Sequence, residues 1–317
     1  MTSAQIGPVV ELDTEFATAI QQAMAAVEKA MQDVVNSDVE VLADASRHIL
    51  SAGGKRVRPR LLMLAYMSLG GTDFDYAAPP AAAVELMHTA SVVHDDINDH
   101  GVLRRGRPSV NAIWGRTFAL LTGDFLFTAV YKLLAPYGDL NIVLARAATA
   151  LVEGETLQAH AVKTKTFTSE VYARIIALKT AALFQAAAEM GGRLANGTPD
   201  QVHALAQYGF NVGLAFQIVD DILDVIGDEA TLGKTANLDS AQGRGLISVE
   251  DDPAEQSGAD VVESIKHKLL QGDRLQKGRE QAEALVQMAV AQLDVLPTSD
   301  AKNELISLAE FILKRDR

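Results

Sequence analysis

Two acidic clusters lie inside apolar segments at widely separated places in the chain. The first is Asp95-Asp96-Ile97-Asn98-Asp99, and the second is Asp220-Asp221-Ile222-Leu223-Asp224. In each cluster the first and last aspartates are four residues apart, which places both on one face of an α-helix. Because like charges at this spacing repel each other, helices that carry them need a cationic partner. The pattern therefore predicts two helices that direct carboxylates into a common cavity.

Divalent metal ions are the partners that best suit these carboxylates. A hard cation with oxygen ligands converts the repulsion into coordination, and Mg²⁺ fits best because phosphate oxygens and water complete its shell. A single acidic cluster is more often a solvated helix face, whereas two matching clusters favour a metal site. His94 and His100 flank the first cluster and raise zinc as an alternative. That alternative is weaker because the chain has no cysteine and the aspartates prefer harder ions.

The composition favours one all-α domain. The 317 residues contain no Ser/Pro/Gly-rich linker, repeat or low-complexity run, so we expect a single domain over residues 1–317. The hydrophobic content of 48% can fill a large core, and with 9 prolines the chain keeps long Ala/Leu-rich stretches that favour helices. The formal net charge of -13 argues against binding to nucleic acid or to an anionic membrane surface.

The sequence also bears on the compartment of the protein. The chain has no cysteine for disulfides, and its first residues lack a basic region followed by an apolar run, so we expect a cytoplasmic protein. No apolar stretch approaches the ~20 uncharged residues that span a bilayer. We therefore expect at most peripheral contact with a membrane.

Apolar residues at three- and four-residue spacing predict helices throughout the chain. Pro79-Pro80 should open the helix that carries the first acidic cluster, and the helix with the second cluster should end near Gly227, leaving Lys234 in a loop. The predicted helices cover residues 13–50, 61–69, 79–100, 111–136, 139–163, 169–190, 199–226, 260–271, 275–293 and 298–315.

Two basic clusters are local exceptions in this acidic chain. One is Lys55-Arg56-Val57-Arg58-Pro59-Arg60, whose proline suits the first turn of a helix, where backbone amides and cationic side chains together can bind an anion. A solvated basic turn is the alternative. The other is Arg104-Arg105-Gly106-Arg107-Pro108, directly after the first acidic cluster. Because surface ion pairs contribute little to stability, we interpret the neighbouring clusters as a site that binds a polyanion through metal ions and arginines together.

Three polar residues within apolar helices are further candidates. Lys179 precedes Thr180 and a run of alanines, where an isolated buried lysine would be costly, so we expect it to face the cavity. Gln217 lies three and four residues before the first two aspartates of the second acidic cluster and shares their helix face. His88 belongs to a polar stripe that leads to the first acidic cluster, although a histidine in such a place is more often a satisfied core residue.

In their order along the chain, these residues resemble the motifs of trans-type polyprenyl diphosphate synthases, and the resemblance covers nearly the whole chain. The motifs are Gly53-Gly54-Lys55-Arg56-Val57-Arg58-Pro59, Asp95 to Asp99 followed by Arg104-Arg105-Gly106, Lys179-Thr180, Gln217, and Asp220 to Asp224. The resemblance implies a bundle of long helices around a deep central cavity, normally as a homodimer. It also implies a reaction in which isopentenyl diphosphate attacks the carbocation formed from an allylic diphosphate, with the departing pyrophosphate as the base.

The resemblance further assigns roles to individual residues. It implies that three Mg²⁺ ions bind through Asp95, Asp99 and Asp220, with Asp96, Asp221 and Asp224 as further candidates. The positions that hold the allylic diphosphate are matched by Arg104, Lys179, Thr180, Gln217 and Lys234. The positions that bind isopentenyl diphosphate are matched by Lys55, Arg58, His88 and Arg105.

Small residues near the first acidic cluster bear on product length. Ala90 and Ser91 lie about one helical turn deeper than Asp95, and neither is large enough to block a growing chain. Family members with short products resemble one another in carrying aromatic residues there or a two-residue insertion in the first motif, so the resemblance implies a long-chain product. Candidates for the floor of the cavity are Phe118, Phe125 and Phe127, which are equally compatible with ordinary core.

One segment departs from the family pattern, and three alternative functions stay open. Residues 239–248 keep an aspartate, a glycine and a basic residue but lack the family's threonine and proline, which bears on how this loop closes over the site. The leading hypothesis is an enzyme that makes the tail of a lipid quinone or carrier lipid. The alternatives are a medium-chain (C20–C25) synthase, a terpene cyclase, which would not need the isopentenyl diphosphate residues, and a non-catalytic partner subunit, which would be expected to lose one of the motifs.

Overall fold

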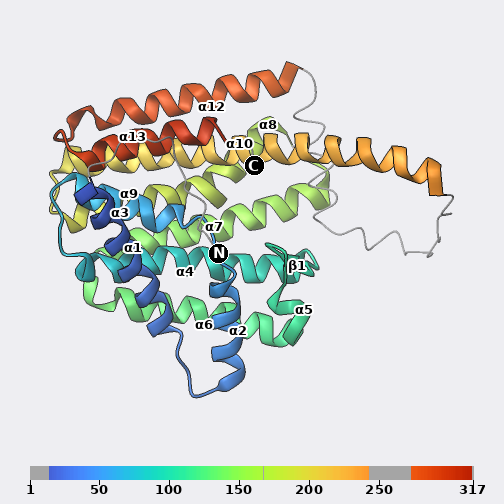
Figure 1. The fold of residues 1–317 in the computed structure, drawn as a ribbon, viewed down its shortest axis with the longest axis horizontal. Coiled ribbons are helices and arrows are strands. Elements are labelled where there is room, and N and C mark those ends of the chain that lie inside the picture. Colours follow the sequence, from blue (N-terminus) through green and yellow to red (C-terminus); the bar gives the residue numbers. More distant parts are fainter. Residues whose placement is uncertain (1–13, 167, 243–272, 316–317) are drawn as a thin grey trace.

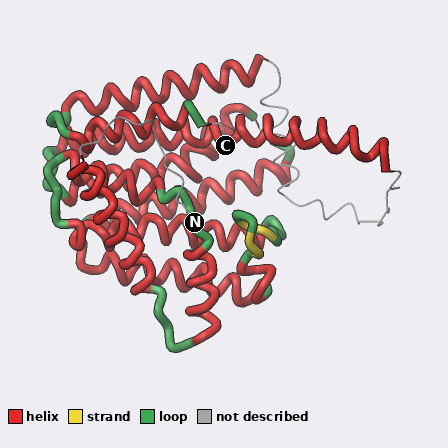
Figure 2. The backbone as a smooth tube through the Cα atoms, viewed as in Figure 1, coloured by secondary structure: helices red, strands yellow, loops and turns green. Residues whose placement is uncertain are grey.

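Helices make up nearly all of the described chain, in agreement with the all-α prediction (Figure 1, Figure 2). The computed structural model describes residues 14–166, 168–242 and 273–315, with side chains described as far as Asp224 in the second range and from Leu275 in the third. Two-residue strands form one short hairpin, in which Leu103 pairs with Pro108 and Arg104 with Arg107.

The helices follow one another through short connections. Before the hairpin come α1 (Thr14–Val34), α2 (Glu40–Ser51), α3 (Val57–Ser68) and α4 (Phe74–Asn98). The hairpin consists of β1 (Leu103–Arg104) and β2 (Arg107–Pro108). After it come α5 (Val110–Trp114), α6 (Arg116–Leu134), the 3-10 turn η1 (Ala135–Tyr137), α7 (Leu140–Thr164), α8 (Ser169–Ile176), the π turn η2 (Ala177–Ala181), α9 (Ala182–Leu194), α10 (Pro199–Gln242), α12 (Asp273–Gln292), the 3-10 turn η3 (Leu293–Val295) and α13 (Asp300–Leu313).

Helix α4, which carries the first acidic cluster, lies inside the bundle. It packs against α1, α3, α6 and α9, and most of its residues between Ala77 and Ile97 are buried. A helix that is apolar on all sides is expected to be buried on all sides, so the polar residues along α4 need partners. Helix α9 also packs against α10, which carries the second cluster. The two acidic clusters are thus held by helices that share a packing partner.

One hydrophobic core extends through the bundle from Ile20 in α1 to Ile312 in α13. Its largest fully buried side chains include Phe184 and Tyr208. The Tyr208 hydroxyl donates a hydrogen bond of 2.6 Å to the backbone oxygen of Leu305. Because the hydroxyl has a partner, the core buries this ring without an unsatisfied polar atom.

The predicted start of the helix at Pro79-Pro80 is wrong. Helix α4 begins at Phe74, and its N-cap residue Asp73 accepts a hydrogen bond of 3.0 Å from the backbone amide of Tyr76. This cap satisfies one of the amides that a helix start leaves free, so the helix begins before the prolines and encloses them.

Two predictions that depended on glycine are also corrected. The predicted helix over residues 111–136 is divided between α5 and α6 at Gly115, whose φ of +80° lies in the left-handed region. In contrast, α10 continues past Gly227 to Gln242, because a glycine inside a helix costs only ~1 kcal/mol relative to alanine. The backbone of Lys234 is therefore helical rather than part of a loop. The predicted helix over residues 260–271 and residues 243–248 of the atypical segment lie outside the described residues.

Two of the described segments are long and apolar enough to cross a membrane by length and composition alone. They are Arg116–Tyr137, which contains α6, and Ser169–Leu194, which contains α8 and α9. Both carry charged residues, among them Asp124 and Lys179, and both pack against other helices of the bundle. Core helices pass the same test, so this finding is weak evidence for membrane insertion.

Candidate active site

One cavity brings together most of the residues that the sequence singled out. Its volume is 860 Å³, and its walls come from the segment before α3, from α3, α4, the hairpin, α7, the π turn and α10. The candidate residues that line it are Lys55, Arg58, His88, Ser91, Asp95, Arg104, Arg105, Lys179, Thr180, Gln217 and Asp220. The predicted common cavity for the two acidic clusters is therefore present.

Asp95 and Lys179 face each other across this cavity. The Lys179 Nζ lies 3.8 Å from Asp95 Oδ2 and 2.7 Å from Glu155 Oε1. Burial raises the pKa of Asp95 to about 7; Lys179 opposes this rise, while the carboxylates of Glu155 and Asp99 add to it. A carboxylate with a raised pKa in a cavity, next to a second carboxylate, is one that a bound cation would stabilise.

Glu155 is a site residue that the sequence reasoning missed. It lies on α7, lines the cavity and forms the shorter of the two ion pairs of Lys179. A Cβ added to the preceding residue, Gly154, would lie 2.8 Å from the backbone nitrogen of Lys179, so this glycine permits α7 to approach the π turn closely. The sequence signal for Glu155 was an acidic pair, Glu153 and Glu155, around a glycine in a helix.

The other two aspartates of the first cluster point elsewhere. Asp96 is buried, and its Oδ1 accepts hydrogen bonds of 2.6 and 3.1 Å from Nη2 and Nε of Arg104. Its Oδ2 is buried without a hydrogen-bond partner among the described residues. Asp99 is the C-cap of α4 and is exposed. Of this cluster, Asp95 is the member that lines the cavity.

The second acidic cluster divides in a similar way. Asp220 lines the cavity, and Arg315 Nη2 lies 3.0 Å from its Oδ1. Asp221 is 1% exposed and accepts hydrogen bonds from Tyr172 Oη (2.6 Å) and Gln217 Nε2 (3.0 Å). Asp224 is exposed. Asp221 therefore anchors a network of side chains, while Asp220 is the member that faces the cavity.

The π turn η2 connects this network to the first cluster. It contains Lys179, which pairs with Asp95, and Thr180, whose hydroxyl donates a hydrogen bond of 2.7 Å to Gln217 Oε1. π turns inside α-helices are frequently found at functional sites. One wide turn thus presents two neighbouring residues to two different walls of the cavity.

Three basic side chains and a histidine also line this cavity: Lys55, Arg58, Arg105 and His88. The Arg58 guanidinium lies 4.8 Å from the centre of the Phe184 ring, and its Nε is buried without a hydrogen-bond partner among the described residues. Burial lowers the pKa of the His88 ring well below its ordinary value, and the charges of Arg58 and Arg105 lower it further. These side chains gather hydrogen-bond donors in one place, and at least one donor, Arg58 Nε, has no partner among the described residues, so the arrangement is suited to bind an anion.

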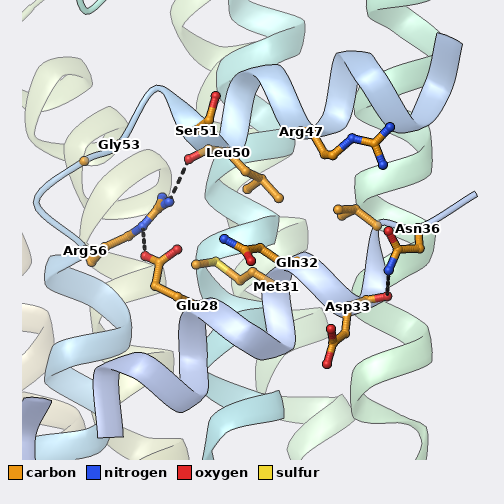
Figure 3. A pocket seen from close by; sticks show the side chains of 12 residues that line it. Glu28, Met31, Gln32, Asp33, Asn36, Arg47, Leu50, Ser51, Gly53 and Arg56 are labelled. Atoms are coloured by element: carbon orange, nitrogen blue, oxygen red, sulfur yellow. Dashed lines mark hydrogen bonds and ion pairs between the residues drawn. The ribbon is translucent and has the colours of Figure 1, made fainter. Parts of the chain in front are cut away.

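Arg56 and Arg60 belong to the first basic cluster but are used within the protein. Figure 3 shows Arg56 beside a second cavity of 640 Å³ between α1 and α2, with Nε 2.7 Å from Glu28 Oε1 and Nη2 3.0 Å from the Leu50 backbone oxygen. Its Nη1 lies 3.1 Å from Glu85 Oε1. Arg60 pairs with Glu304. These pairs fix the segment before α3, so that Lys55 and Arg58 line the larger cavity.

The residues considered for product length are placed differently from one another. Ser91 lines the cavity, and Ala90 is buried in the core. Phe125 and Phe127 are partly buried against the core, while the Phe118 side chain is 44% exposed on α6. None of the three phenylalanines is among the residues that line the described cavity.

The two histidines beside the first acidic cluster do not point to a common place. His94 Nε2 lies 3.2 Å from the Leu120 backbone oxygen on α6, and a Cβ added to Gly123 would lie 2.2 Å from the same nitrogen. His100 is exposed and has a φ of +53°. Among the described residues, no group of three or more His, Asp or Glu side chains is already arranged to hold a metal ion.

An all-helical bundle with acidic and basic residues around one cavity is suited to an enzyme that acts on a diphosphate. The model of the polyprenyl synthetase family matches residues 39–250, which include both acidic clusters and both basic clusters. The chain belongs to this family, as its resemblance predicted, and is a prenyltransferase.

Relatives with different product names match the chain over almost its full length. It is 34% identical over 313 residues to octaprenyl diphosphate synthase from Escherichia coli (93% of this chain, 97% of the relative). It is 35% identical over 317 residues to a short chain isoprenyl diphosphate synthase from Methanothermobacter thermautotrophicus (91% of this chain, 95% of the relative). Overall identity therefore identifies the family better than it identifies the product length.

The fold agrees with a solved structure of the same family. The crystal structure of a polyprenyl synthase from Caulobacter crescentus, complexed with calcium and isoprenyl diphosphate, superposes with a TM-score of 0.79 at 31% identity. The match covers 99% of this chain and 100% of that one. In that protein a divalent cation and an isoprenyl diphosphate were bound together.

Proposed function

We propose that the protein condenses isopentenyl diphosphate with an allylic diphosphate, such as the geranyl, farnesyl or geranylgeranyl ester. The product is a long-chain all-trans polyprenyl diphosphate, and pyrophosphate is released. The observation that carries this proposal is that one cavity holds two separate sets of cationic side chains. In one set Lys179 and Arg104 form ion pairs with Asp95 and Asp96, and the other set consists of Lys55, Arg58 and Arg105 with the His88 ring in the same cavity. Two diphosphates require two such sets.

The acidic residues fit Mg²⁺. All available donors are carboxylate oxygens, Asp95 has a raised pKa, and Asp96 has a buried oxygen without a hydrogen-bond partner among the described residues. Asp95, Asp99 and Asp220 would hold the ions, with Asp96, Asp221 and Asp224 in support, and the number that we propose is three. When bound, Mg²⁺ neutralises the charge that develops on the departing pyrophosphate.

The cationic side chains bind and orient the two substrates. Arg104 and Lys179 already lie beside the aspartates and would hold the allylic diphosphate together with Thr180 and Gln217. Lys234 remains a candidate for the same diphosphate, with its backbone in α10 and its side chain outside the described residues. Lys55, Arg58, His88 and Arg105 would hold isopentenyl diphosphate.

These residues support a reaction that needs no protein nucleophile. The allylic C–O bond breaks as pyrophosphate departs, the double bond of isopentenyl diphosphate forms the new C–C bond, and a proton lost from the resulting cation passes to pyrophosphate. Cationic donors around the leaving group lower the barrier to the first step. Apolar side chains that line the cavity, Val92, Leu151 and Phe216, exclude water that would otherwise trap the carbocation.

Product length is tested by the reaction itself. The small side chains of Ala90 and Ser91 support a long chain, and Phe125 and Phe127 remain candidates for the floor. The experiment incubates the protein with Mg²⁺, labelled isopentenyl diphosphate and a farnesyl or geranylgeranyl primer, followed by chromatography of the products. Products longer than C25 support the proposal, products that stop at C20 or C25 support the medium-chain alternative, and a lack of elongation supports a non-catalytic partner subunit.

We also propose that the protein is a homodimer. Several large apolar side chains are exposed on α6 and α7, and they include Phe118, Leu121, Tyr131 (70% exposed), Ile142 and Val152. Exposed apolar surface of this kind is expected to be covered by a partner, and a second copy of the chain would bury Phe118. Analytical ultracentrifugation of the wild-type protein and of L121D tests this: a dimer that dissociates in the variant supports the proposal, and a wild-type monomer contradicts it.

The remaining expectations concern the setting of the reaction. We propose that residues 1–317 act as a single domain, supported by the continuous core from Ile20 to Ile312. We further propose a cytoplasmic enzyme that contacts a membrane only peripherally, when it releases its apolar product into a pathway for a lipid quinone or carrier lipid. Fractionation of cells that express the protein, with and without a high-salt wash, tests the location.

A further inference from the structure

Arg315 reaches the active-site cavity from the end of the chain. It follows α13, and its side chain is only 6% exposed. Its Nη2 lies 3.0 Å from Asp220 Oδ1, and its guanidinium lies 4.6 Å from the centre of the Phe216 ring. Asp220 and Phe216 both line the cavity. A residue remote from every motif in the sequence is thus placed against the proposed metal and substrate site.

Most of the hydrogen-bonding capacity of Arg315 is unused. Its Nε and Nη1 are buried and have no hydrogen-bond partner among the described residues. An arginine presents its donors in a fixed planar fork that matches the oxygens of a carboxylate or phosphate. Buried donors without a partner are rare because their desolvation is costly. The geometry is therefore suited to an anion with several oxygens, which would use the donors that Asp220 leaves free.

Arg315 completes a pattern of ion pairs around the cavity. In the structure Lys179 pairs with Asp95, and Arg104 pairs with Asp96. The resemblance assigns both of these cations to a diphosphate and both aspartates to metal ions. Arg315 with Asp220 is a third pair of the same kind. In each pair a basic side chain balances the charge of a carboxylate that is a proposed Mg²⁺ ligand. Once Mg²⁺ binds that carboxylate, the basic side chain is available to bind a phosphate group.

The surroundings of Arg315 indicate which diphosphate it would contact. Two neighbouring rings connect Arg315 to Arg58. The Arg315 guanidinium lies over Phe216, the centre of that ring lies 5.3 Å from the centre of the Phe184 ring, and the Arg58 guanidinium lies over Phe184. In agreement with this arrangement, the charge of Arg315 adds to the effect of burial in lowering the pKa of Lys55. Arg58 and Lys55 both belong to the set proposed for isopentenyl diphosphate.

We propose that Arg315 is a further substrate-binding residue, which balances Asp220 while no metal is bound and then binds the diphosphate of isopentenyl diphosphate next to Lys55. The inference rests on the proposed function and assigns to the end of the chain a role in the same site.

The test measures binding without turnover. Isopentenyl diphosphate alone cannot react, so its dissociation constant can be measured by calorimetry in the presence of Mg²⁺ for wild-type, R315Q, R315K and K314Q proteins. Loss of a charge-assisted bidentate contact should weaken binding in R315Q by about tenfold to a hundredfold. K314Q is the matched control, because Lys314 is the neighbouring residue, is 62% exposed and lies 3.8 Å from its ion-pair partner Glu310. The K314Q protein should bind isopentenyl diphosphate with the wild-type affinity.

Other outcomes of this experiment overturn the inference. They are an unchanged affinity in R315Q, an equal loss in K314Q, or weaker binding of a non-reactive allylic thiodiphosphate with unchanged binding of isopentenyl diphosphate. If circular dichroism shows that R315Q does not fold, the R315K protein provides the test. Lysine keeps the positive charge but lacks the planar set of guanidinium donors, so R315K should bind isopentenyl diphosphate severalfold more weakly than wild type. A wild-type affinity in R315K would overturn the inference. A wild-type protein that does not bind isopentenyl diphosphate would contradict the proposed function itself.

Discussion

Tyr172 donates a hydrogen bond of 2.6 Å from its hydroxyl to Oδ2 of Asp221, across the interface between α8 and α10. Burial raises the pKa of Tyr172, and the charge of Asp221 adds to the rise, so the hydroxyl stays protonated and remains a donor. The other oxygen of Asp221 accepts from Gln217. Hydrogen bonds from two sides therefore fix this aspartate of the second acidic cluster.

The first prediction concerns this contact. Y172F should lower the free energy of unfolding by about 1.5–3 kcal/mol, because a buried carboxylate loses one of its donors. It should also raise the Mg²⁺ concentration needed for half-maximal activity, since α10 would hold Asp220 less rigidly. Urea denaturation and a Mg²⁺ titration of turnover measure the two effects. Y76F, which removes a hydroxyl from a ring that is 49% exposed, should leave both quantities unchanged.

The second prediction concerns pH. His88 has a pKa well below its ordinary value, chiefly because it is buried, so it is neutral in the folded protein and takes up a proton on unfolding in acid. Stability should therefore fall as the pH drops below the unfolded value of about 6.5, with a slope of up to about 1.4 kcal/mol per pH unit from this residue. In H88Q this contribution should be absent. Urea denaturation between pH 5 and 7.5 measures the slope, and H203Q, at an exposed histidine of α10, should retain it.

A third prediction separates stability from activity at Asp95. Burial and neighbouring carboxylates disfavour its charge, so D95N should stabilise the protein against urea in the presence of a metal chelator. The same change removes a proposed metal ligand and should lower kcat by a factor of about 10² or more. D99N provides the comparison for stability, because Asp99 is exposed. If D95N is instead less stable than wild type, the ion pair between Asp95 and Lys179 stabilises the folded protein by more than the burial of the Asp95 charge costs.

The fourth prediction concerns Ser91, which lines the cavity one turn from Asp95. S91F should shorten the longest product, because the ring would occupy the path of the growing chain, while the KM for a geranyl primer should change little. S91A adds no bulk and should give the wild-type distribution. Chromatography of labelled products from the three proteins measures the effect, and an unchanged length in S91F would place the chain along another wall.

Local signals were sufficient to predict much of the fold. The spacing of apolar residues predicted α7 as residues 139–163, and the helix is Leu140–Thr164. The signals failed where a tertiary or capping contact outweighs a local preference. Asp73 starts α4 before its prolines, and α10 continues through Gly227 because one glycine costs a helix only ~1 kcal/mol relative to alanine. A proline or glycine makes a helix locally less favourable, and a cap or the rest of the helix can offset that cost.

The candidate site was predicted to the extent that its residues lie in motifs. Asp95 and Lys179 were found because charge is unusual in apolar helices, and Arg58 was found because it belongs to a basic cluster in an acidic chain; the structure brings all three to one cavity. Glu155 and Arg315 were missed, because each stands in a helix or tail where an acidic or basic residue is ordinary. Their importance arises from partners far away in the sequence, such as Asp220 for Arg315. A single sequence holds no direct record of such contacts.

The π turn has a consequence for how the two acidic clusters are held. Lys179 and Thr180 are adjacent in the chain, yet one contacts Asp95 on α4 and the other contacts Gln217 on α10. Gln217 in turn donates a hydrogen bond to Asp221, so a short series of side chains runs from Asp95 through adjacent residues of one turn to the second acidic cluster. The π turn therefore gives the two aspartate clusters, 125 residues apart in the chain, a shared support.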